Sequence, residues 1–233
     1  MLEVCQNRSR EKEFLGKHHI PCAEFAVVDS PAALREAIGR IEMPAVLKSA
    51  DFGYDGKGQV RIRDEAELHS AFSRLGAEVG VLESWVEHSG EFSIIVARNE
   101  AGEKSAFPVA ENVHVNHILH TSLMPARLSE EETADLRDIA FAVIDAFGMV
   151  GLAGIEFFRS SRGWLVNEIA PRPHNSGHLT FDACLTSQFE QCVRATCGLP
   201  FGDTRLLSAG VMMNLLGDLW AEGPPDWGEA LKH

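Results

Sequence analysis

The chain has 233 residues, 45% of them hydrophobic, and its 21 Lys and Arg residues against 34 Asp and Glu residues give a formal net charge of −13. This acidity argues against binding to nucleic acid and to anionic membranes, since both depend on clustered Lys and Arg. No apolar run approaches the roughly 18 residues of a membrane helix, the first residues lack the apolar stretch of a signal peptide, and the five cysteines form no C-x-x-C pair. We expect a soluble, cytoplasmic protein of one or two domains that can still bind small anionic molecules through local positive charge.

Helix and strand patterns alternate over the first third of the chain. Ser30 and Pro31 are typical of an N-cap followed by the first helical residue, and Asp64 is a second candidate N-cap. In chain order, the predicted elements are a helix at 9–18, a strand at 24–28, a helix after Ser30, strands at 45–48 and 59–63 around a glycine-rich loop, and a helix after Asp64.

From residue 79 the pattern changes to closely spaced strands. They are predicted at 79–85, 92–98, 105–109, 113–116 and 118–122. Ser129 and Glu132 form a capping-box pattern before a helix that ends at Gly148. Two strands at 151–159 and 164–169 then share a short turn, and a last helix covers about 185–197. The whole pattern predicts an α+β fold with mostly antiparallel sheets, not a doubly wound parallel sheet.

The glycine-rich loop is the first segment that could carry chemistry. Lys48 ends a predicted strand, and Gly53, Gly56 and Gly58 follow within ten residues. Glycines let backbone N–H groups approach a phosphate, and a strand lysine beside them suits a triphosphate. The loop matches neither the Walker P-loop nor the Rossmann pattern. A plain hairpin with a glycine-rich tip explains it equally well.

Two glutamates near the following strand are candidate nucleoside ligands. Glu83 lies where an apolar strand ends, and Glu91 follows closely after it. A carboxylate at a strand end can accept hydrogen bonds from ribose hydroxyls or an adenine amino group. Exposed strand termini are the alternative explanation for both residues.

Glu156 and Glu168 lie on consecutive predicted strands joined by a short turn. Antiparallel pairing would place them nearly opposite each other, with Asn167 adjacent. Two carboxylates and an amide oxygen suit Mg²⁺, especially when nucleotide phosphates complete its coordination. The alternative is a half-exposed hairpin on which both glutamates face solvent.

The loop directly after Glu168 is unusually polar and stiff. Two prolines accompany four hydrogen-bonding side chains, those of Arg172, His174, Asn175 and Ser176. This composition indicates a ligand-binding loop, for which an ordinary exposed turn is the alternative.

In this order, the four segments resemble the nucleotide site of ATP-grasp enzymes. More specifically, the chain resembles the ATP-dependent subunit of phosphoribosylaminoimidazole carboxylase, also called 5-(carboxyamino)imidazole ribonucleotide synthase. The resemblance covers about residues 5–220 and is carried by Gln6-Asn7-Arg8 with Glu11-Lys12, by the segment 52–59, by Glu111-Asn112-Val113-His114, and by the segment 167–178.

The resemblance implies carboxylation of 5-aminoimidazole ribonucleotide with bicarbonate and ATP, through carboxyphosphate, in de novo purine synthesis. The ATP contacts it implies are Arg8, Lys48, Gly53, Tyr54, Asp55, Gly56, Lys57, Gly58, Gln59, Glu83, Ser84, Trp85, Val86, Glu91, His114, Asn167 and Glu168. The residues it implies around the reacting groups are Tyr54, Asp55, Lys57, Arg172, His174, Asn175 and Ser176. Glu156 and Glu168 would hold Mg²⁺, or Mn²⁺ in its place.

The resemblance also implies a domain organisation. Residues 1–199 would form the ATP-grasp domain, with a lid subdomain at about 45–85, and residues 200–233 would begin a shortened C-terminal domain. Family members usually have an additional N-terminal domain and form homodimers, so we expect an incomplete copy. An ATP-binding module without catalysis and another ATP-grasp ligase remain the alternatives.

Overall fold

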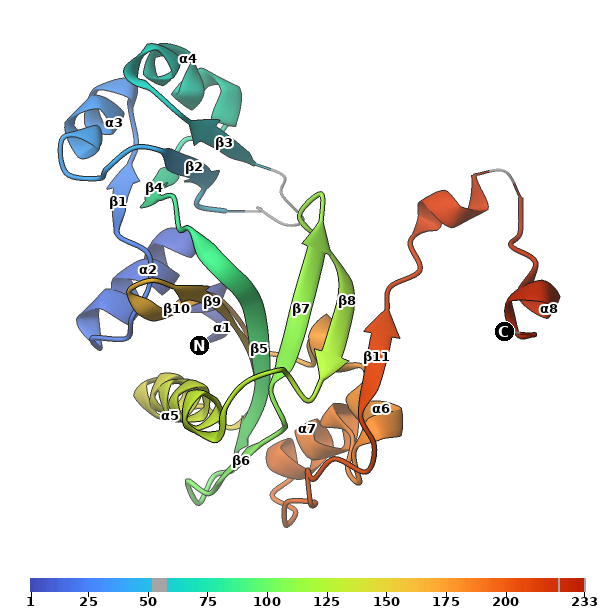
Figure 1. The fold of residues 1–233 in the computed structure, drawn as a ribbon. Helices are drawn as coiled ribbons and strands as arrows, with labels where there is room; N and C mark the ends of the chain where they lie inside the picture. Colours follow the sequence, from blue (N-terminus) through green and yellow to red (C-terminus); the bar gives the residue numbers. More distant parts are fainter. Residues whose placement is uncertain (52–57, 222, 233) are drawn as a thin grey trace.

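The computed structural model describes residues 1–51, 58–221 and 223–232, and Figure 1 shows its arrangement. Its named strands form two sheets, one of four strands and one of seven, in which every strand pairing is antiparallel. The predicted α+β fold with mostly antiparallel sheets is thereby confirmed.

The smaller sheet has the strand order β1-β4-β2-β3. Its strands are β1 (Phe25–Val28), β2 (Ala45–Ser49), β3 (Gln59–Ile62) and β4 (Gly80–Ser84). Two helices, α3 (Pro31–Ile38) and α4 (Glu65–Leu75), pack against it through Leu34, Leu68 and Leu75. Both predicted N-caps are confirmed, because the side chain of Ser30 accepts from Ala33 N and that of Asp64 accepts from the second and third backbone N–H groups of α4.

The larger sheet has the order β10-β9-β5-β7-β8-β11, with β6 added beside β5. Its strands are β5 (His88–Arg98), β6 (Lys104–Ala106), β7 (Ala110–Val115), β8 (Ile118–Met124), β9 (Gly151–Ser160), β10 (Gly163–Ala170) and β11 (Gly210–Met213).

Helices cover both faces of this sheet (Figure 1). One face packs against α2 (Arg8–Lys17) and α5 (Glu130–Ala146). The other packs against α7 (Gln188–Thr196) and against Leu179 and Cys184, which flank α6 (Thr180–Ala183). Ile94 and Val96 of β5 join the first core cluster, whereas Ile95 and Ala97 join the second. Burial on both faces explains why β5 has a continuous apolar run rather than an alternating one.

Short elements complete the chain. They are α1 (Leu2–Cys5), the 3₁₀ turns η1 (Asn175–Gly177) and η2 (Gly217–Trp220), and α8 (Trp227–Ala230). After β11 the chain runs away from the two sheets (Figure 1), and the large apolar side chains of Leu219, Trp220 and Trp227 are exposed there. None of the helices among the described residues has the length and apolarity to cross a membrane.

The predicted elements differ from the observed ones mainly at their ends. The strand expected at 105–109 is only Lys104–Ala106, although Phe107 N beyond its end still donates to Ile95 O at 2.9 Å. The helix expected at 185–197 begins later, at Gln188, where the Ser187 side chain caps it by accepting from Glu190 N. Neither α1 nor β11 was predicted.

Candidate active site

The predicted site residues lie on both sheets and on helix α2. Arg8 begins α2, Lys48 lies near the end of β2, and Glu83 is next to last in β4. The larger sheet contributes polar side chains from neighbouring strands, namely Glu91 in β5, His114 in β7, Glu156 in β9, and Asn167 and Glu168 in β10.

The remaining predicted ATP contacts that lie among the described residues belong to β3, to β4 and to the segments beside them. Gly53, Tyr54, Asp55, Gly56 and Lys57 lie outside the described residues. Gly58, which has a φ of 68°, accepts a hydrogen bond from Ser49 N at 2.7 Å, and Gln59 begins β3. Trp85 is exposed, with Cζ of Arg61 3.9 Å from its ring centroid, and Val86 lies in the connection to β5.

A buried group of charges lies where β2, β4 and α2 meet. Lys48 Nζ donates to Glu83 Oε2 at 3.0 Å, and Lys12 Nζ lies 3.5 Å from the same oxygen. Burial by itself favours the neutral carboxyl of Glu83, but Lys12, Lys48 and Arg8 outweigh it and lower its pKa to about 2. Burial also lowers the pKa of Lys48, although Glu83 opposes this shift. The cations therefore hold Glu83 ionised in the interior.

Lys12 was not predicted as a site residue, although it is fully buried. Besides its contact with Glu83, Lys12 Nζ donates to the backbone oxygen of Asn167 at 3.4 Å. It therefore links β4 of the smaller sheet with β10 of the larger one. The sequence contained a signal, because position 12 is three residues before Leu15 and thus on the same buried face of the helix.

Glu91 and His114 form an ion pair across β5 and β7. His114 Nδ1 lies 2.6 Å from Glu91 Oε2. Burial favours the neutral imidazole, but the close contact with Glu91 and the charges of Glu91, Glu156 and Glu168 outweigh it and raise the pKa of His114. The pair joins one predicted ATP contact to another.

The two predicted metal ligands are paired directly. The register of β9 and β10 places Glu156 opposite Glu168, with a bulge between Val166 and Glu168 at Asn167. Asn167 Nδ2 donates to Glu156 Oε2 at 3.2 Å. Burial, followed by the charge of Glu168, raises the pKa of Glu156 to about 7. A cation between the two carboxylates would relieve both unfavourable effects.

The chemistry of these donors fits Mg²⁺ held jointly with a ligand. Among the described residues, no cluster of three or more His, Cys, Asp and Glu side chains is arranged to hold a metal. Two glutamate carboxylates and an asparagine amide are hard oxygen donors, and Mg²⁺ commonly takes one or two carboxylates with phosphate and water completing its shell.

The polar loop after β10 folds back against Glu156. His174 Nε2 lies 3.5 Å from Glu156 Oε1, and His174 is buried. Burial, and then the charges of Arg172, His114 and His178, lower the pKa of His174 to about 4. Ser176 is also buried and Asn175 is half-buried, whereas Arg172 is exposed and donates to Pro173 O.

Several buried polar atoms at this site have no hydrogen-bond partner among the described residues. They are Arg8 Nε, Glu83 Oε1, Ser84 Oγ, Asn175 Oδ1 and His114 Nδ1, the last of which contacts Glu91 without hydrogen-bond geometry. Buried polar atoms without partners are rare and cost free energy. Their concentration on predicted ligand contacts indicates groups that a bound molecule would satisfy.

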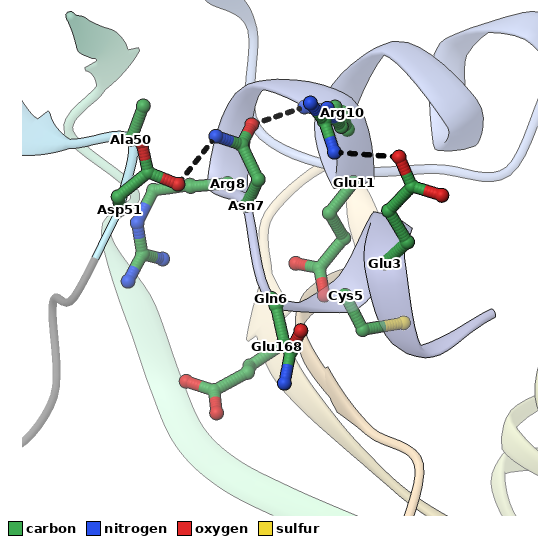
Figure 2. Close-up of a pocket in the computed structure, with 10 residues that line it drawn as sticks. All are labelled: Glu3, Cys5, Gln6, Asn7, Arg8, Arg10, Glu11, Ala50, Asp51 and Glu168. Atoms are coloured by element: carbon green, nitrogen blue, oxygen red, sulfur yellow. Dashed lines mark hydrogen bonds and ion pairs between the residues drawn. The ribbon is translucent and has the colours of Figure 1, made fainter.

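A pocket of about 460 Å³ opens between the first two helices, the end of β2 and β10. Figure 2 shows the residues that line it, which are Glu3, Cys5, Gln6, Asn7, Arg8, Arg10, Glu11, Ala50, Asp51 and Glu168. Asn7 Nδ2 donates to Asp51 Oδ1 at 2.7 Å, and this bond ties α2 to the chain just before the glycine loop. The pocket is thus continuous with the Glu168 side of the metal pair.

Comparison with known proteins adds a family match. The family model described as the ATP-grasp domain matches residues 13–189. A curated relative, the N5-carboxyaminoimidazole ribonucleotide synthase of Bacillus subtilis (strain 168), is 46% identical over 219 residues, covering 94% of this chain and 58% of the relative. This chain therefore spans little more than half the length of that protein.

Solved structures agree with this match. The N5-carboxyaminoimidazole ribonucleotide synthetase of Thermus thermophilus has a TM-score of 0.90 and 38% identity, covering 100% of this chain and 62% of that chain. An Aspergillus clavatus N5-carboxyaminoimidazole synthase in complex with ADP and 5-aminoimidazole ribonucleotide has a TM-score of 0.85 and 28% identity, covering 92% of this chain and 58% of that chain.

Proposed function

Because the chain belongs to the ATP-grasp family, we propose that it binds Mg·ATP where its two sheets meet and uses it to carboxylate 5-aminoimidazole ribonucleotide. One observation carries the proposal. The register-paired carboxylates Glu156 and Glu168 lie beside the His174 loop and, through Lys12, next to the buried Lys48–Glu83 pair. The names of the relatives, including one complex with ADP and 5-aminoimidazole ribonucleotide, support this choice of substrate.

The nucleotide would lie against residues of both sheets. Lys48 and Arg8 supply positive charge for its phosphates. Glu83 Oε1 and Ser84 Oγ, which have no hydrogen-bond partner in the part of the chain that the structure describes, are suited to hydrogen bonds with the nucleoside. Val86 follows them in the chain. The proposed contacts are completed by Glu91 and His114, by Gly58 and Gln59, and by residues 53–57, which lie outside the described residues.

Glu156, Glu168 and Asn167 would hold Mg²⁺, or Mn²⁺ in its place. When bound there, the ion would supply positive charge that offsets charge on the transferring phosphoryl group. The raised pKa of Glu156 supports this assignment, because a nearby cation favours the ionised carboxylate that burial and Glu168 disfavour.

The proposed reaction has two steps. An oxygen of bicarbonate attacks the γ-phosphorus, the bond to the β–γ bridging oxygen breaks, and ADP leaves with that electron pair. The exocyclic amine of 5-aminoimidazole ribonucleotide then attacks the carbon of carboxyphosphate, or of the CO₂ it releases, as phosphate leaves and the amine loses a proton. The residues that would surround the reacting groups and exclude water are Arg172, His174, Asn175 and Ser176, with Tyr54, Asp55 and Lys57.

Phosphate release from ATP tests the proposal. We expect release by the intact chain to depend on bicarbonate and to rise when 5-aminoimidazole ribonucleotide is added. Glu156→Gln should lower Mg²⁺-dependent release while circular dichroism shows an unchanged fold, since an amide is a weaker metal ligand than a carboxylate.

If that nucleotide has no effect on this chain but stimulates a full-length relative, the proposed activity is rejected for this chain. Mg·ATP binding without release would then indicate a nucleotide-binding module. Release stimulated by another acceptor would indicate a different ATP-grasp ligase.

We extend the proposal to the organisation of the protein. Residues 1–199 would form the ATP-grasp domain, with a lid at about 45–85, and residues 200–233 would belong to a second domain. In support, three of the four strands of the smaller sheet lie within 45–85, while β1 lies outside this range.

We also propose a cytoplasmic homodimer. Val113, Val211 and Met213 are exposed on one face of β7 and β11, where cross-strand pairing with β8 aligns them in rows. An exposed apolar sheet face of this kind supports an interface between copies. Sedimentation velocity would give the mass, and a monomer at all concentrations would contradict the dimer.

A further inference from the structure

A chain of buried hydrogen bonds crosses the larger sheet beneath the His174 loop. Ser122 Oγ donates to Asn112 Oδ1 at 2.7 Å, and Asn112 Nδ2 donates to Ser93 Oγ at 2.9 Å. Ser93 Oγ donates in turn to Ser176 Oγ at 2.7 Å. These four residues are at most 5% exposed. The polar chain therefore runs entirely through the protein interior.

The sheet register explains how these residues meet. Ser122, Asn112 and Ser93 come from β8, β7 and β5, which are neighbours in the sheet, and Asn112 is directly opposite Ser122. A buried hydroxyl or amide is costly without partners. Here each hydroxyl has a partner. Asn112 accepts through Oδ1 and donates through Nδ2, so these hydrogen bonds run from Ser122 towards Ser176.

This direction decides which ring nitrogen of the neutral His174 imidazole carries the proton. Ser176 Oγ accepts from Ser93, so its own proton is available to His174 Nδ1, which lies 2.8 Å away. The backbone N–H of Ser176 also donates to Nδ1, at 3.4 Å. Since an N–H group can only donate, Nδ1 must be an acceptor. A neutral imidazole with an acceptor at Nδ1 carries its proton on Nε2.

The backbone of His174 is held by contacts outside these serine and asparagine hydrogen bonds. The buried side-chain amide of Gln188 accepts from His174 N at 2.9 Å and donates to His174 O at 2.8 Å. Gly154 of β9 leaves room for the side chain, since a Cβ there would lie 2.5 Å from His174 Cβ. Nε2, the ring nitrogen opposite the acceptor, lies 3.5 Å from Glu156 Oε1.

We propose that His174 is a positioning residue, held in the Nε2–H tautomer so that this N–H faces Glu156 and orients it as a metal ligand. The role in orienting a metal ligand rests on the proposed function. The tautomer rests only on the hydrogen bonds of His174 and does not depend on the metal. Asn167 Nδ2 already donates to Glu156 Oε2, so His174 would provide the donor on the other oxygen. Donors of this kind orient ligating carboxylates.

The tautomer can be measured directly in the full chain without metal. In ¹⁵N-histidine-labelled protein at pH 7, the NMR chemical shifts of the two ring nitrogens distinguish the Nε2–H tautomer, the Nδ1–H tautomer and the imidazolium. The signals of His174 are assigned by their loss in His174→Gln or by sequential assignment. We expect a neutral ring protonated on Nε2. The Nδ1–H tautomer or an imidazolium would overturn the inference.

Two amide variants test the positioning role. The amide nitrogen of Gln can lie where Nε2 lies, whereas the shorter Asn reaches only the position of Nδ1. In calorimetric titrations of Mg²⁺ with ATP present, His174→Asn should weaken Mg²⁺ affinity by about 10- to 100-fold, the range for lost outer-shell partners. His174→Gln should weaken it distinctly less.

Equal affinities in both variants would overturn the positioning role. If the unaltered chain fails to bind Mg·ATP, the proposed function fails and the metal role fails with it. The tautomer is measured in metal-free protein. It therefore shows whether the hydrogen bonds of His174 were interpreted correctly, even if Mg·ATP binding fails.

Discussion

At the residue scale, the buried charges of α2 are the main feature that sequence reasoning overlooked. Lys12 and Glu11 are both buried, and both contact β10, Lys12 through Asn167 O and Glu11 through Ile169 N. The sequence shows which face of the helix position 12 occupies. However, Glu83, the partner of Lys12, lies far along the chain, in β4 of the smaller sheet. Such long-range pairing depends on the tertiary fold, which local patterns do not determine.

Lys12→Met should destabilise the protein. Its free energy of unfolding should fall by less than the roughly 3–5 kcal/mol that an uncompensated buried charge costs, because Lys48 still pairs with Glu83. Urea unfolding measures the change. Lys17→Met, on the exposed side of the same helix, is the matched control. Equal midpoints for the two variants would show that Lys12 contributes no buried ion pair.

Glu11 gives a pH-dependent prediction. Burial raises its pKa to about 7 from an ordinary value of 4.5, with the Glu168 charge adding to the shift while Lys12 and Arg8 oppose it. The folded state therefore binds this proton more tightly, and its stabilising contribution is present below about pH 4.5 and lost as pH rises through about 7.

Glu11→Gln removes this titration while keeping an oxygen for Ile169 N. Its free energy of unfolding, relative to the unaltered chain, should rise with pH by on the order of 3 kcal/mol between about pH 4 and pH 8. Denaturant unfolding at a series of pH values gives this difference. A constant difference across the series would contradict the raised pKa.

At the element scale, local patterns predicted much of the fold because the signals lie within a few residues. The caps Ser30 and Asp64 and the Ser129 capping box are observed. The short turn after β9 correctly predicted that Glu156 and Glu168 face each other. Strand β11 was missed because it is short and its neighbour among the described residues, β8, is distant in sequence.

The contact between β9 and the following loop gives a prediction for Gly154. A Cβ at this position would lie 2.5 Å from His174 Cβ and 3.3 Å from Ile95 Cδ1, so the backbone of the loop must shift. Gly154→Ala should destabilise by about 1–3 kcal/mol, as overpacking does, and should lower Mg·ATP binding. Thermal unfolding and calorimetry measure the two effects.

Gly217→Ala is the matched control, since a Cβ there meets nothing within 4 Å. Its stability should change by no more than about 0.5 kcal/mol. Wild-type stability in Gly154→Ala would contradict the close packing of His174 on β9.

At the scale of the whole molecule, the predicted ATP-grasp fold is confirmed by the family match over residues 13–189 and by the similar solved structures. The acidic composition is compatible with anionic substrates because positive groups collect at one place, namely Lys12, Lys48 and Arg8 around Glu83. The glycine-loop contacts at 53–57 and the individual site roles stay predictions.

Calorimetric titration of the intact chain with ATP, in the presence and absence of Mg²⁺, tests the central claim most directly. We predict one Mg·ATP per chain, with binding that weakens without the metal and in Glu156→Gln. Absence of binding by the folded chain in the presence of Mg²⁺ would contradict the proposed nucleotide and metal site.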